Sequence, residues 1–479
     1  MNVGKQNKLV QSITSREENY AQWYTDLCLK AELMDYSDAK GFIIYRPYGY
    51  AIWENIQSYL DFKFKETNHE NVYMPLVIPE SLFQKEKDHV EGFAPETAMI
   101  TTTGVEELNE RLIVRPTSET LFCTHFSKIV NSYRDLPKLY NQWCSVVRWE
   151  KTTRPFLRGK EFLWQEGHTV HANEKEAQNE ALNMLEIYRK LGENLLAIPF
   201  ITGKKTEKEK FAGALDTYTI EALMPDGQAL QSGTTHYFGQ EFAKAFDIKF
   251  QNEENKPEFV YQTSWGVSTR LIGAIIMVHG DDEGLVLPPY VAPKQIVIVP
   301  IQDKKQEVID ATQQVYQSLK TLGLRVFIDD SKKSPGWKFS EHEMKGVPLR
   351  IEVGPRDLEN GVITIATRYN REKIQVKIEE VSKMIPNLLK EIHEKMLKKA
   401  NDYVSSHTYV AKTYDEFKSY LKQGGYIQMS VAGEEAELKI KEDTGATARI
   451  VPFDQTLLTD ICPVTGKKAT QTIWFARAY

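Results

Sequence analysis

The 479-residue sequence predicts a multidomain protein of mixed α/β and α+β class. Its length corresponds to about three domains at roughly 150 residues each. A proline-rich segment at residues 287–293 ends a long first region. After it, strand and helix patterns alternate as in βαβ units, and a third pattern begins near residue 400. We therefore expect domains at residues 1–290, 291–400 and 401–479.

The first region contains a predicted long helix at residues 48–65. Apolar side chains recur there at helical spacing: Ala51, Ile52, Ile56, Tyr59, Leu60 and Phe64. Residues 71–79 are predicted to form a strand that prolines interrupt, which confines it to a sheet edge or an interface. Residues 263–277 change from a polar, Gly-containing stretch into a helix of small apolar residues.

The second region is predicted to be a small α/β domain. Four segments have the composition of strands: residues 295–301, 324–328, 349–353 and 362–366. The helix between the first two has one apolar face, made of Val308, Ala311, Val315, Leu319 and Leu322. Gly323 is a helix stop signal, and residues 381–400 form another predicted helix.

Composition excludes several classes of protein. The net charge of -6 rules out a uniformly basic coat for nucleic acid, although it permits a local basic face. The four cysteines are scattered, which argues against a disulfide scaffold and a CxxC zinc knuckle. The first 20 residues lack a signal-peptide core, and no run of about 18 apolar residues predicts a membrane span. We expect a cytoplasmic protein that does not enter membranes.

Residues 146–168 predict a strand, a basic loop and a second strand. Arg148 and Glu150 lie two residues apart at the end of the first strand, so we expect both on one side. The loop has a charge density suited to a triphosphate, from Lys151, Arg154, Arg158 and Lys160. The second strand alternates functional side chains on one face: Phe162, Trp164, Glu166 and His168. The alternative is an exposed hairpin with solvated charges.

A second pattern joins a strand to a helix at residues 263–279. Gly266 permits close approach of a ligand to the backbone. Arg270 is expected near the start of the helix, where anions bind readily. The alternative is an ordinary turn followed by a surface arginine.

Together these segments resemble motifs two and three of class II aminoacyl-tRNA synthetases, and residues 48–75 resemble motif one, the dimer-interface element. Four further segments resemble prolyl-tRNA synthetases of the archaeal and eukaryotic-like type: residues 115–120 (RPTSET), 205–213 (KTEKEKFAG), 231–236 (QSGTTH) and 278–281 (VHGD). The resemblance covers nearly the whole chain. It implies a class II antiparallel-sheet catalytic domain, an α/β anticodon-binding domain and a small α+β C-terminal domain.

The same resemblance implies a homodimeric ligase that activates L-proline with ATP and Mg²⁺, then transfers the prolyl group to the 3′ end of proline tRNA. Such chemistry depends on positioning and charge neutralisation. Arg148 and Arg270 are the implied catalytic residues. Arg148 would hold the α-phosphate and the proline carboxylate. Arg158 and Arg270 would hold the terminal phosphates, and Phe162 would stack on adenine. The implied ATP-binding residues are Arg148, Glu150, Arg158, Phe162, Gln231, Thr234, Ser268 and Arg270, with Gln231 as the magnesium ligand.

The implied proline pocket contains two acceptors for the imino group. Thr117 and Glu119 would bind the secondary ammonium, which has two N–H donors to satisfy. The implied proline-binding residues are Thr117, Glu119, Arg148, Trp164, Glu166, His168 and His236. A helix N-cap is the alternative role of Thr117. Structural hydrogen bonding is the alternative for His168 and His236.

The implied anticodon-binding domain has a local excess of positive charge. Residues 294–399 contain 20 Lys and Arg against 15 Asp and Glu. Arg and Lys can donate to guanine O6 and N7, and a carboxylate can accept from N1 and N2. The candidate base contacts are Lys338, Lys345, Arg350, Glu352 and Arg356. The alternative is a solvated helix face.

The C-terminal region departs from the family pattern. Many relatives bind a structural zinc there with four cysteines, whereas this chain retains Cys462 and has Thr465 in place of a second thiol. One thiol cannot build the tetrahedral site, so we expect no zinc. Tyr479 is implied to reach toward the catalytic domain. Only 113 residues separate Glu150 from Ser264, so we expect neither the editing domain that bacterial-type relatives insert there nor hydrolysis of alanyl-tRNA.

Two other functions are compatible with parts of this pattern. Class II enzymes for threonine, glycine or histidine share the anticodon domain, but the threonine type needs a catalytic zinc with Cys and His ligands. Cys123 and Cys144 have no obvious partner set, and residues 116–119 favour proline. A catalytically inactive RNA-binding relative would be expected to lack Arg148 or Arg270, and both are present.

Overall fold

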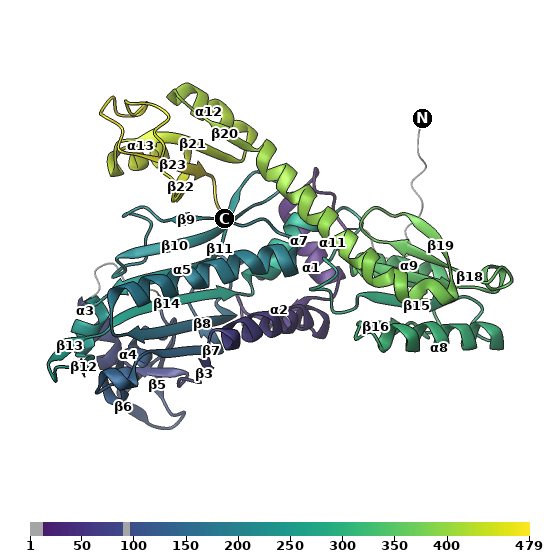
Figure 1. The fold of residues 1–479 in the computed structure, drawn as a ribbon, viewed down its shortest axis with the longest axis horizontal. Helices are drawn as coiled ribbons and strands as arrows, with labels where there is room; N and C mark the ends of the chain where they lie inside the picture. Colours follow the sequence, from purple (N-terminus) through teal and green to yellow (C-terminus); the bar gives the residue numbers. More distant parts are fainter. Residues whose placement is uncertain (1–12, 90–95) are drawn as a thin grey trace.

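The chain is described by a computed structural model that covers residues 13–89 and 96–479. A large body built on a seven-stranded sheet occupies one side, and a smaller body with a five-stranded sheet lies beside it (Figure 1). A third body, here called the C-terminal unit (residues 401–479), contains a four-stranded sheet. None of the described helices combines the length and apolar character needed to cross a bilayer.

The seven-stranded sheet is antiparallel except at one edge, where β3 runs parallel to β7. The order across the sheet is β3 (Glu70–Asn71), β7 (Lys138–Val147), β8 (Glu161–His171), β14 (Tyr261–Ser268), β11 (Ala229–Gly239), β10 (Asp216–Leu223) and β9 (Ile201–Lys204). The 113 residues between Glu150 and Ser264 supply most of these strands, with two helices and the hairpin β12 (Lys249–Gln251) and β13 (Pro257–Phe259). They form part of the large body and not a separate domain.

Helices cover both faces of this sheet. On one face lie α2 (Pro47–Glu66), α5 (Glu174–Leu191) and α7 (Arg270–His279); on the other lie α4 (Glu119–Ile129) and α6 (Glu241–Phe246). Tyr188 of α5 donates to Gln165 of β8 over 2.7 Å, which places the odd-numbered side chains of this part of β8 under α5. Because side chains alternate along a strand, Trp164, Glu166 and His168 lie on the opposite face.

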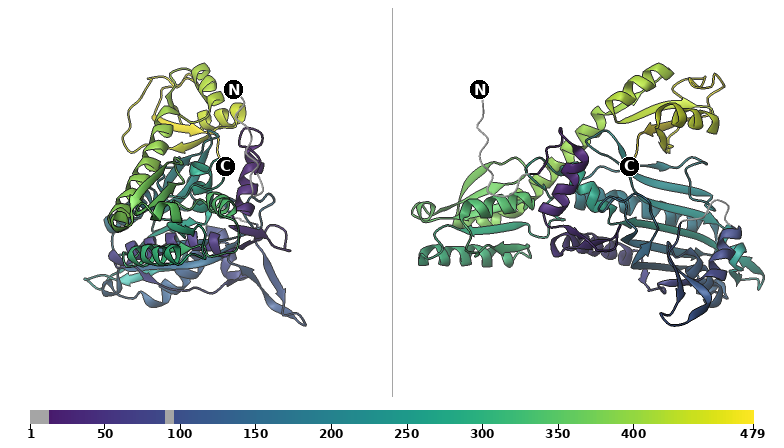
Figure 2. Two further views of the ribbon diagram at one scale, coloured as in Figure 1. Left: turned by 90° about the vertical axis from the view of Figure 1, so that its right-hand side faces the viewer. Right: turned by 180° about the vertical axis from the view of Figure 1, so that it is seen from behind.

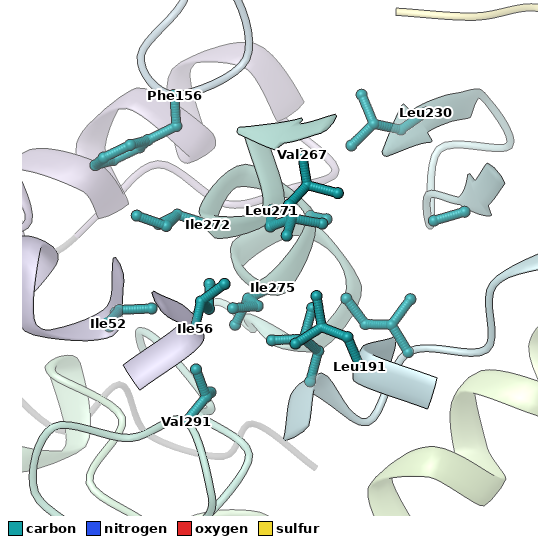
Figure 3. Close-up of a cluster of buried hydrophobic side chains, with 14 of the residues drawn as sticks. Ile52, Ile56, Phe156, Leu191, Leu230, Val267, Leu271, Ile272, Ile275 and Val291 are labelled. Carbon is teal, nitrogen blue, oxygen red and sulfur yellow. The ribbon is translucent and has the colours of Figure 1, made fainter. Parts of the chain in front are cut away.

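Apolar packing fixes the start of α7 relative to the sheet. Leu271, Ile272 and Ile275 of this helix are buried, and they pack with Ile52 and Ile56 of α2 in one cluster (Figure 3). The cluster contains the apolar face that the sequence predicts for residues 48–65. Burial of several such side chains, each contributing about 1.5–3 kcal/mol, holds the first turn of α7 beside the sheet.

The remaining elements of the large body lie toward its edges. They are α1 (Tyr20–Lys30), the hairpin β1 (Met34–Tyr36) and β2 (Ile43–Tyr45), α3 (Glu80–His89), and a three-stranded sheet of β4 (Val77–Pro79), β6 (Glu107–Val114) and β5 (Met99–Thr102). The predicted strand at residues 71–79 is thus two short strands in different sheets. Its prolines prevent one continuous ladder.

The second body contains a mixed five-stranded sheet. Its order is β16 (Val326–Ile328), β15 (Ile296–Pro300), β17 (Leu349–Val353), β18 (Val362–Thr367) and β19 (Lys373–Lys377), of which the first three are parallel. Its helices are α8 (Gln306–Lys320), α9 (Pro335–Met344), α10 (Pro355–Leu358) and α11 (Val381–Ser406). The predicted strands are confirmed, whereas β19 and α9 are additional, and α11 continues past the expected end at residue 400.

The long helix α11 runs from the second body to the C-terminal unit, as the view from behind shows (Figure 2). The strand order of that unit is β20 (Thr408–Val410), β21 (Tyr426–Val431), β23 (Gln471–Ala476) and β22 (Thr447–Ile450). Two helices pack on it, α12 (Tyr414–Gln423) and α13 (Glu434–Thr444). The backbones of Lys204 and Val451 pair with each other, so the unit meets the edge strand β9 of the seven-stranded sheet.

Candidate active site

A cavity of about 270 Å³ opens on the sheet face that faces away from α5. It gathers side chains from α4, its preceding loop, the end of β7, and strands β8, β10, β11 and β14. All seven residues expected at the proline pocket line it, including Arg148, which is also expected at ATP, and two further residues expected at ATP line it as well: Thr117, Glu119, Arg148, Trp164, Glu166, His168, Gln231, Thr234 and His236. Glu209, Phe211, Thr217 and Ser264 also line it. The sequence assigned no role to any of the four, although Glu209 and Phe211 lie in the segment at residues 205–213 and Ser264 in the one at 263–279.

Glu166 is buried at the base of this cavity and is held by several protein groups. Gln142 donates to Oε1 over 2.6 Å, Ser118 donates to the same oxygen, and His168 Nε2 lies 2.9 Å from Oε2. Burial alone would raise the pKa of Glu166, but the hydrogen bonds from His168 and the other donors outweigh it and lower the pKa. The carboxylate is therefore charged and fixed in orientation.

Glu119 is a second buried carboxylate and begins α4. Thr117 donates a hydrogen bond to it, and both side chains are almost fully buried. The N-cap of α4 is Ser118, so the alternative assignment of Thr117 as the cap is wrong. Thr117 instead presents its hydroxyl beside Glu119 in the cavity.

Arg148 brings a positive charge to the same cavity. Its Nε donates to the carbonyl oxygen of Pro116 over 3.0 Å, and its guanidinium lies over the rings of Phe162 and Trp164 at 5.5 and 5.4 Å. Burial lowers the pKa of Arg148, while Glu119 and Glu166 oppose that shift. An arginine pKa remains far above neutrality, so the cavity combines a fixed cation with two carboxylates.

The expectation that Arg148 and Glu150 extend β7 on one side is wrong. The strand ends at Val147, and Glu150 N donates to Arg148 O over 2.7 Å, which is a tight turn. A turn of this kind breaks the two-residue alternation of a strand. Glu150 points toward the loop, with a carboxylate oxygen 3.9 Å from Arg158 Nη1.

Arg270 occupies the first position of α7, as its sequence pattern predicts. Nη1 donates to the carbonyl oxygen of Gln231 over 3.2 Å, and Nε donates to that of Leu157 over 3.1 Å. Ser268 Oγ accepts from the backbone N–H of Arg270 over 3.2 Å. Burial, reinforced by Arg158 and Arg148, lowers the pKa of Arg270 to about 10. The guanidinium is thus charged and lies among other cations.

The expected ATP residues do not all share one cavity. Phe162 and Arg158 line a neighbouring cavity of about 410 Å³ between the β1–β2 hairpin and the loop at residues 153–159. Phe162 also packs edge-on against Trp164, with ring centroids 5.9 Å apart. Arg148 lies over both rings, so the two cavities meet at this pair of aromatic side chains.

The two histidines in the cavity differ in their surroundings. His168 stacks on Phe122 of α4 at 4.1 Å, beside Glu166. His236 packs against Phe211 at 4.7 Å, and its Nδ1 lies 3.0 Å from the Thr217 hydroxyl. Burial, with a smaller contribution from His168, lowers the pKa of His236 to about 3. His236 is therefore neutral at physiological pH, and its position fits a structural or lining role.

Cys144 lies beside Trp164 and Glu166, two residues that line the cavity, in a position that the sequence does not predict. Trp164 Nε1 donates to its sulfur over 3.2 Å, and the sulfur lies 3.6 Å from Glu166 Oε1. Burial, followed by the charge of Glu166, raises the pKa of this thiol to about 12. Among the described residues, Glu119, Glu166 and His168 form a group close enough to share a metal ion, with ligand atoms within 4.8 Å of one another.

The candidate anticodon residues divide into two sets. Lys338 is 2% exposed and donates to Asp329 O over 2.7 Å, and Lys345 pairs with Glu32 and Glu341. Both lysines are thus engaged by other groups of the protein, as Arg350 and Glu352 are. Arg350 pairs with Glu352 and Glu343, at 2.9 and 2.8 Å, and lines a small cavity of about 90 Å³.

Three further basic residues line that cavity with Arg350, namely Arg368, Arg371 and Lys373. Arg356 is exposed at the start of α10. The sequence did not single out the three additional residues because β19 and the turn before it lacked a recognisable strand pattern. The signal that could have found them is the sequence RYNREK at residues 368–373, whose cations follow β18 directly.

Comparisons with known proteins define the class of this chain. Residues 101–279 match the family model described as "tRNA synthetase class II core domain (G, H, P, S and T)". Residues 295–388 match "Anticodon binding domain", and residues 414–479 match "Prolyl-tRNA synthetase, C-terminal". The fold of the large body and its arginine-lined cavity are thus those of a class II aminoacyl-tRNA synthetase.

Curated relatives narrow the class to a family. The chain is 60% identical over 475 residues to "Proline--tRNA ligase" from Onion yellows phytoplasma (strain OY-M), covering 99% of this chain and 100% of the relative. It is 58% identical to "Proline--tRNA ligase" from Clostridium novyi (strain NT), over the full length of both. The crystal structure of prolyl-tRNA synthetase from Cryptosporidium parvum, complexed with halofuginone and AMPPNP, matches with a TM-score of 0.93 and 40% identity, covering 98% and 99% of the two chains. The chain belongs to the prolyl-tRNA synthetases, a family of proline–tRNA ligases.

Proposed function

We propose that the cavity of about 270 Å³ is where this chain activates L-proline with ATP and loads it onto proline tRNA. In the first step an oxygen of the proline carboxylate attacks the α-phosphorus of ATP. Prolyl-adenylate forms and pyrophosphate leaves with the electron pair of the broken P–O bond. In the second step the terminal ribose hydroxyl of the tRNA attacks the prolyl carbonyl carbon, and AMP leaves as that hydroxyl loses its proton.

The proline end of the cavity is defined by opposite charges in one small space. Glu119 and Thr117 would accept the two N–H donors of the secondary ammonium, and Arg148 would bind the carboxylate. Trp164 offers an apolar surface to the ring, and Glu166, His168 and His236 support the walls. The observation that supports this assignment most strongly is that the seven residues come from four separate stretches of the sequence and line one cavity.

The ATP end would lie between Arg148 and Arg270. Arg148 would neutralise the α-phosphate, and Arg270 with Arg158 would bind the terminal phosphates, because their mutual repulsion is relieved by an anion. Gln231 and Thr234 line the cavity with an amide and a hydroxyl. Such oxygen donors suit Mg²⁺, which usually takes few protein ligands beside substrate phosphates. Phe162 would stack on adenine, next to Arg148, with Glu150 and Ser268 nearby.

The second body would receive the tRNA anticodon. The candidates for base contacts are Lys338, Lys345, Arg350, Glu352 and Arg356, and Arg371 and Lys373 extend the same basic surface. We propose the division at residues 1–290, 291–400 and 401–479. It is supported by separate sheets and by a distinct buried core for each of the two smaller bodies.

We further propose a homodimer that acts in the cytoplasm and holds no zinc. Large apolar side chains are exposed along α2 and the segment after it: Tyr50, Phe62, Tyr73 and Leu76. An exposed apolar surface of this kind fits a dimer contact. Sedimentation equilibrium tests it, since Phe62→Lys is expected to shift the chain toward the monomer.

ATP–pyrophosphate exchange tests the proposed reaction directly. Exchange catalysed by the purified chain is expected to depend on proline, and threonine, histidine and glycine should not replace it. Exchange that follows threonine or histidine instead of proline would contradict the assignment of the cavity.

Arg148→Ala tests the role of the cation in the cavity. Loss of a transition-state donor costs about 10²–10³ in rate, and the variant should lose at least that much. Lys256→Ala removes an exposed cation from the turn between β12 and β13 and is the matched control, with an expected change below about threefold. An Arg148→Ala variant with unaltered exchange would refute the mechanism.

A further inference from the structure

Three ionic side chains meet in the protein interior between the C-terminal unit and the seven-stranded sheet. Lys205 Nζ donates to Glu221 Oε1 over 2.7 Å. Arg449 of β22 donates to the same carboxylate from Nε at 3.2 Å and from Nη2 at 3.0 and 3.1 Å. Lys205 also donates to Arg449 O over 3.0 Å. The Glu221 side chain is fully buried, and those of Lys205 and Arg449 are 2% and 8% exposed.

Glu221 lies in the sheet beside Gln231, whose backbone contacts Arg270. Strand β10 pairs Glu221 with Gln231 of β11, at a β-bulge between Ile220 and Glu221. The carbonyl oxygen of Gln231 accepts the hydrogen bond from Arg270 Nη1. A bulge bends its strand locally and is sensitive to the position of its partner residue. The carboxylate that anchors this point of β10 thus lies one strand away from the contact of Arg270.

The charges of these side chains also influence one another's pKa values. Burial lowers the pKa of Arg270, and the positive charges of Arg158, Arg148 and Arg449 add to that shift. Glu221 is the acidic group that opposes it. Lys205 and Arg449 in turn lower the pKa of Glu221 against the effect of burial, so the carboxylate stays ionised. A neutral Glu221 would leave Arg270 among cations alone.

We propose that Glu221 is a positioning residue for Arg270, and that Arg449 of the C-terminal unit holds Glu221 in that role. The inference rests on the proposed binding of ATP phosphates by Arg270. Its consequence is that the C-terminal unit contributes to the use of ATP, from a position outside the cavity, through one buried carboxylate.

The test uses Arg449→Lys and Glu221→Gln in the full chain. Lysine keeps the charge of Arg449 but loses its paired donors, and glutamine keeps the shape of Glu221 but loses its charge. Both variants should lower kcat/KM for ATP about 5- to 20-fold in ATP–pyrophosphate exchange, with the KM for proline within about twofold. Each variant is compared with the unaltered chain at a temperature at which circular dichroism shows both to be folded.

Glu437→Gln is the matched control. Glu437 makes another buried contact between the C-terminal unit and the large body, accepting from Thr206 over 2.8 Å. The contact involves neither Arg270 nor Gln231, so the variant should leave kcat/KM for ATP within about twofold. If Glu437→Gln reproduces the loss seen in Arg449→Lys, docking of the unit explains the effect and the proposal is wrong.

A double-mutant cycle with Arg270→Lys separates the possible failures. If Glu221 and Arg449 act through Arg270, adding Arg449→Lys to Arg270→Lys should change kcat/KM for ATP by less than about twofold. If the losses in kcat/KM for ATP of the two single variants multiply in the double variant, the proposal is wrong. Equal losses for ATP and for proline would also overturn it. An Arg270→Lys variant with normal ATP kinetics would refute the proposed role of Arg270 itself. If kcat/KM for ATP falls in Arg270→Lys but not in Arg449→Lys, the role proposed for Arg449 and Glu221 is wrong while that of Arg270 stands.

Discussion

His168 Nε2 and Glu166 Oε2 lie 2.9 Å apart on the cavity face of β8. The other carboxylate oxygen of Glu166 accepts from Ser118 and Gln142, so protein groups engage both oxygens. Glu119 lies in the same cavity and accepts from Thr117. Glu119 is therefore the carboxylate we expect to bind the substrate ammonium, and Glu166 is the one we expect to maintain the pocket.

Glu119→Gln is expected to raise the KM for proline about 10- to 150-fold, because a hydrogen bond to a charged group contributes about 1.5–3 kcal/mol. The KM for ATP should stay within about twofold, since the phosphates contact other residues. Proline and ATP titrations of pyrophosphate exchange measure both values. Glu254→Gln, at an exposed carboxylate, is the control. Equal increases in both KM values would contradict the assignment.

Gly167→Ala is expected to destabilise the large body. A Cβ at Gly167 would lie 2.1 Å from a ring carbon of the buried Trp265. Overpacking of this kind costs about 1–3 kcal/mol, which lowers the melting temperature of a domain of this size by several degrees. At Gly354 a Cβ would meet Ile301 at an ordinary 3.6 Å, so Gly354→Ala should change little. Calorimetry that finds equal melting temperatures for the two variants would show that Trp265 moves freely aside.

Acid is expected to destabilise the chain through His171. Burial lowers its pKa to about 4, against about 6.5 in the unfolded chain. Below about pH 6.5 the unfolded form takes up a proton that the folded form does not. The free energy of unfolding therefore falls by up to about 1.4 kcal/mol per pH unit down to about pH 4, and this loss is absent above about pH 6.5.

Urea unfolding between about pH 7.5 and about pH 5 measures that dependence. His171→Gln removes the titrating group, so its pH dependence should be smaller by about one proton in this window. An unchanged slope in the variant would mean that His171 titrates normally in the folded chain.

The chain is expected to fold without zinc. Cys462 is buried, and although burial opposes the shift, hydrogen bonds from Thr465 and nearby backbone groups lower its pKa. The family resemblance implies that Thr465 stands where relatives have a second sulfur ligand, and a zinc site needs four ligands. Metal analysis should find no stoichiometric zinc, and a chelator should leave the melting temperature unchanged. One equivalent of zinc per chain would refute this expectation.

Local patterns were sufficient for the parts of the site that lie within one element. Trp164, Glu166 and His168 share a face because alternation is a property of any strand. Arg270 starts a helix where the sequence changes from polar to small apolar residues. The same reasoning failed one residue beyond β7, where a turn separates Arg148 from Glu150. Strand length depends on what pairs with each end, which the local sequence does not encode.

Contacts between distant residues account for what sequence reasoning missed. Phe211 lines the cavity and packs against His236, and Cys144 contacts Trp164 on the neighbouring strand. Lys338 is a candidate base contact in the sequence, yet its side chain is buried and donates to the carbonyl oxygen of Asp329. Each of these contacts depends on which strands become neighbours and on which side chains the fold then buries.

By itself the sequence determined the resemblance to the prolyl-tRNA synthetases, the order of the elements and the identity of the charged groups. Those properties follow from local spacing and from motifs in the chain. Only the tertiary structure decided that Glu166 is engaged on both oxygens while Glu119 faces the cavity. It also decided that Arg449 reaches Glu221 across 228 positions. A buried charged group is stable only when specific partners pair with it, and the tertiary structure determines which residues those partners are.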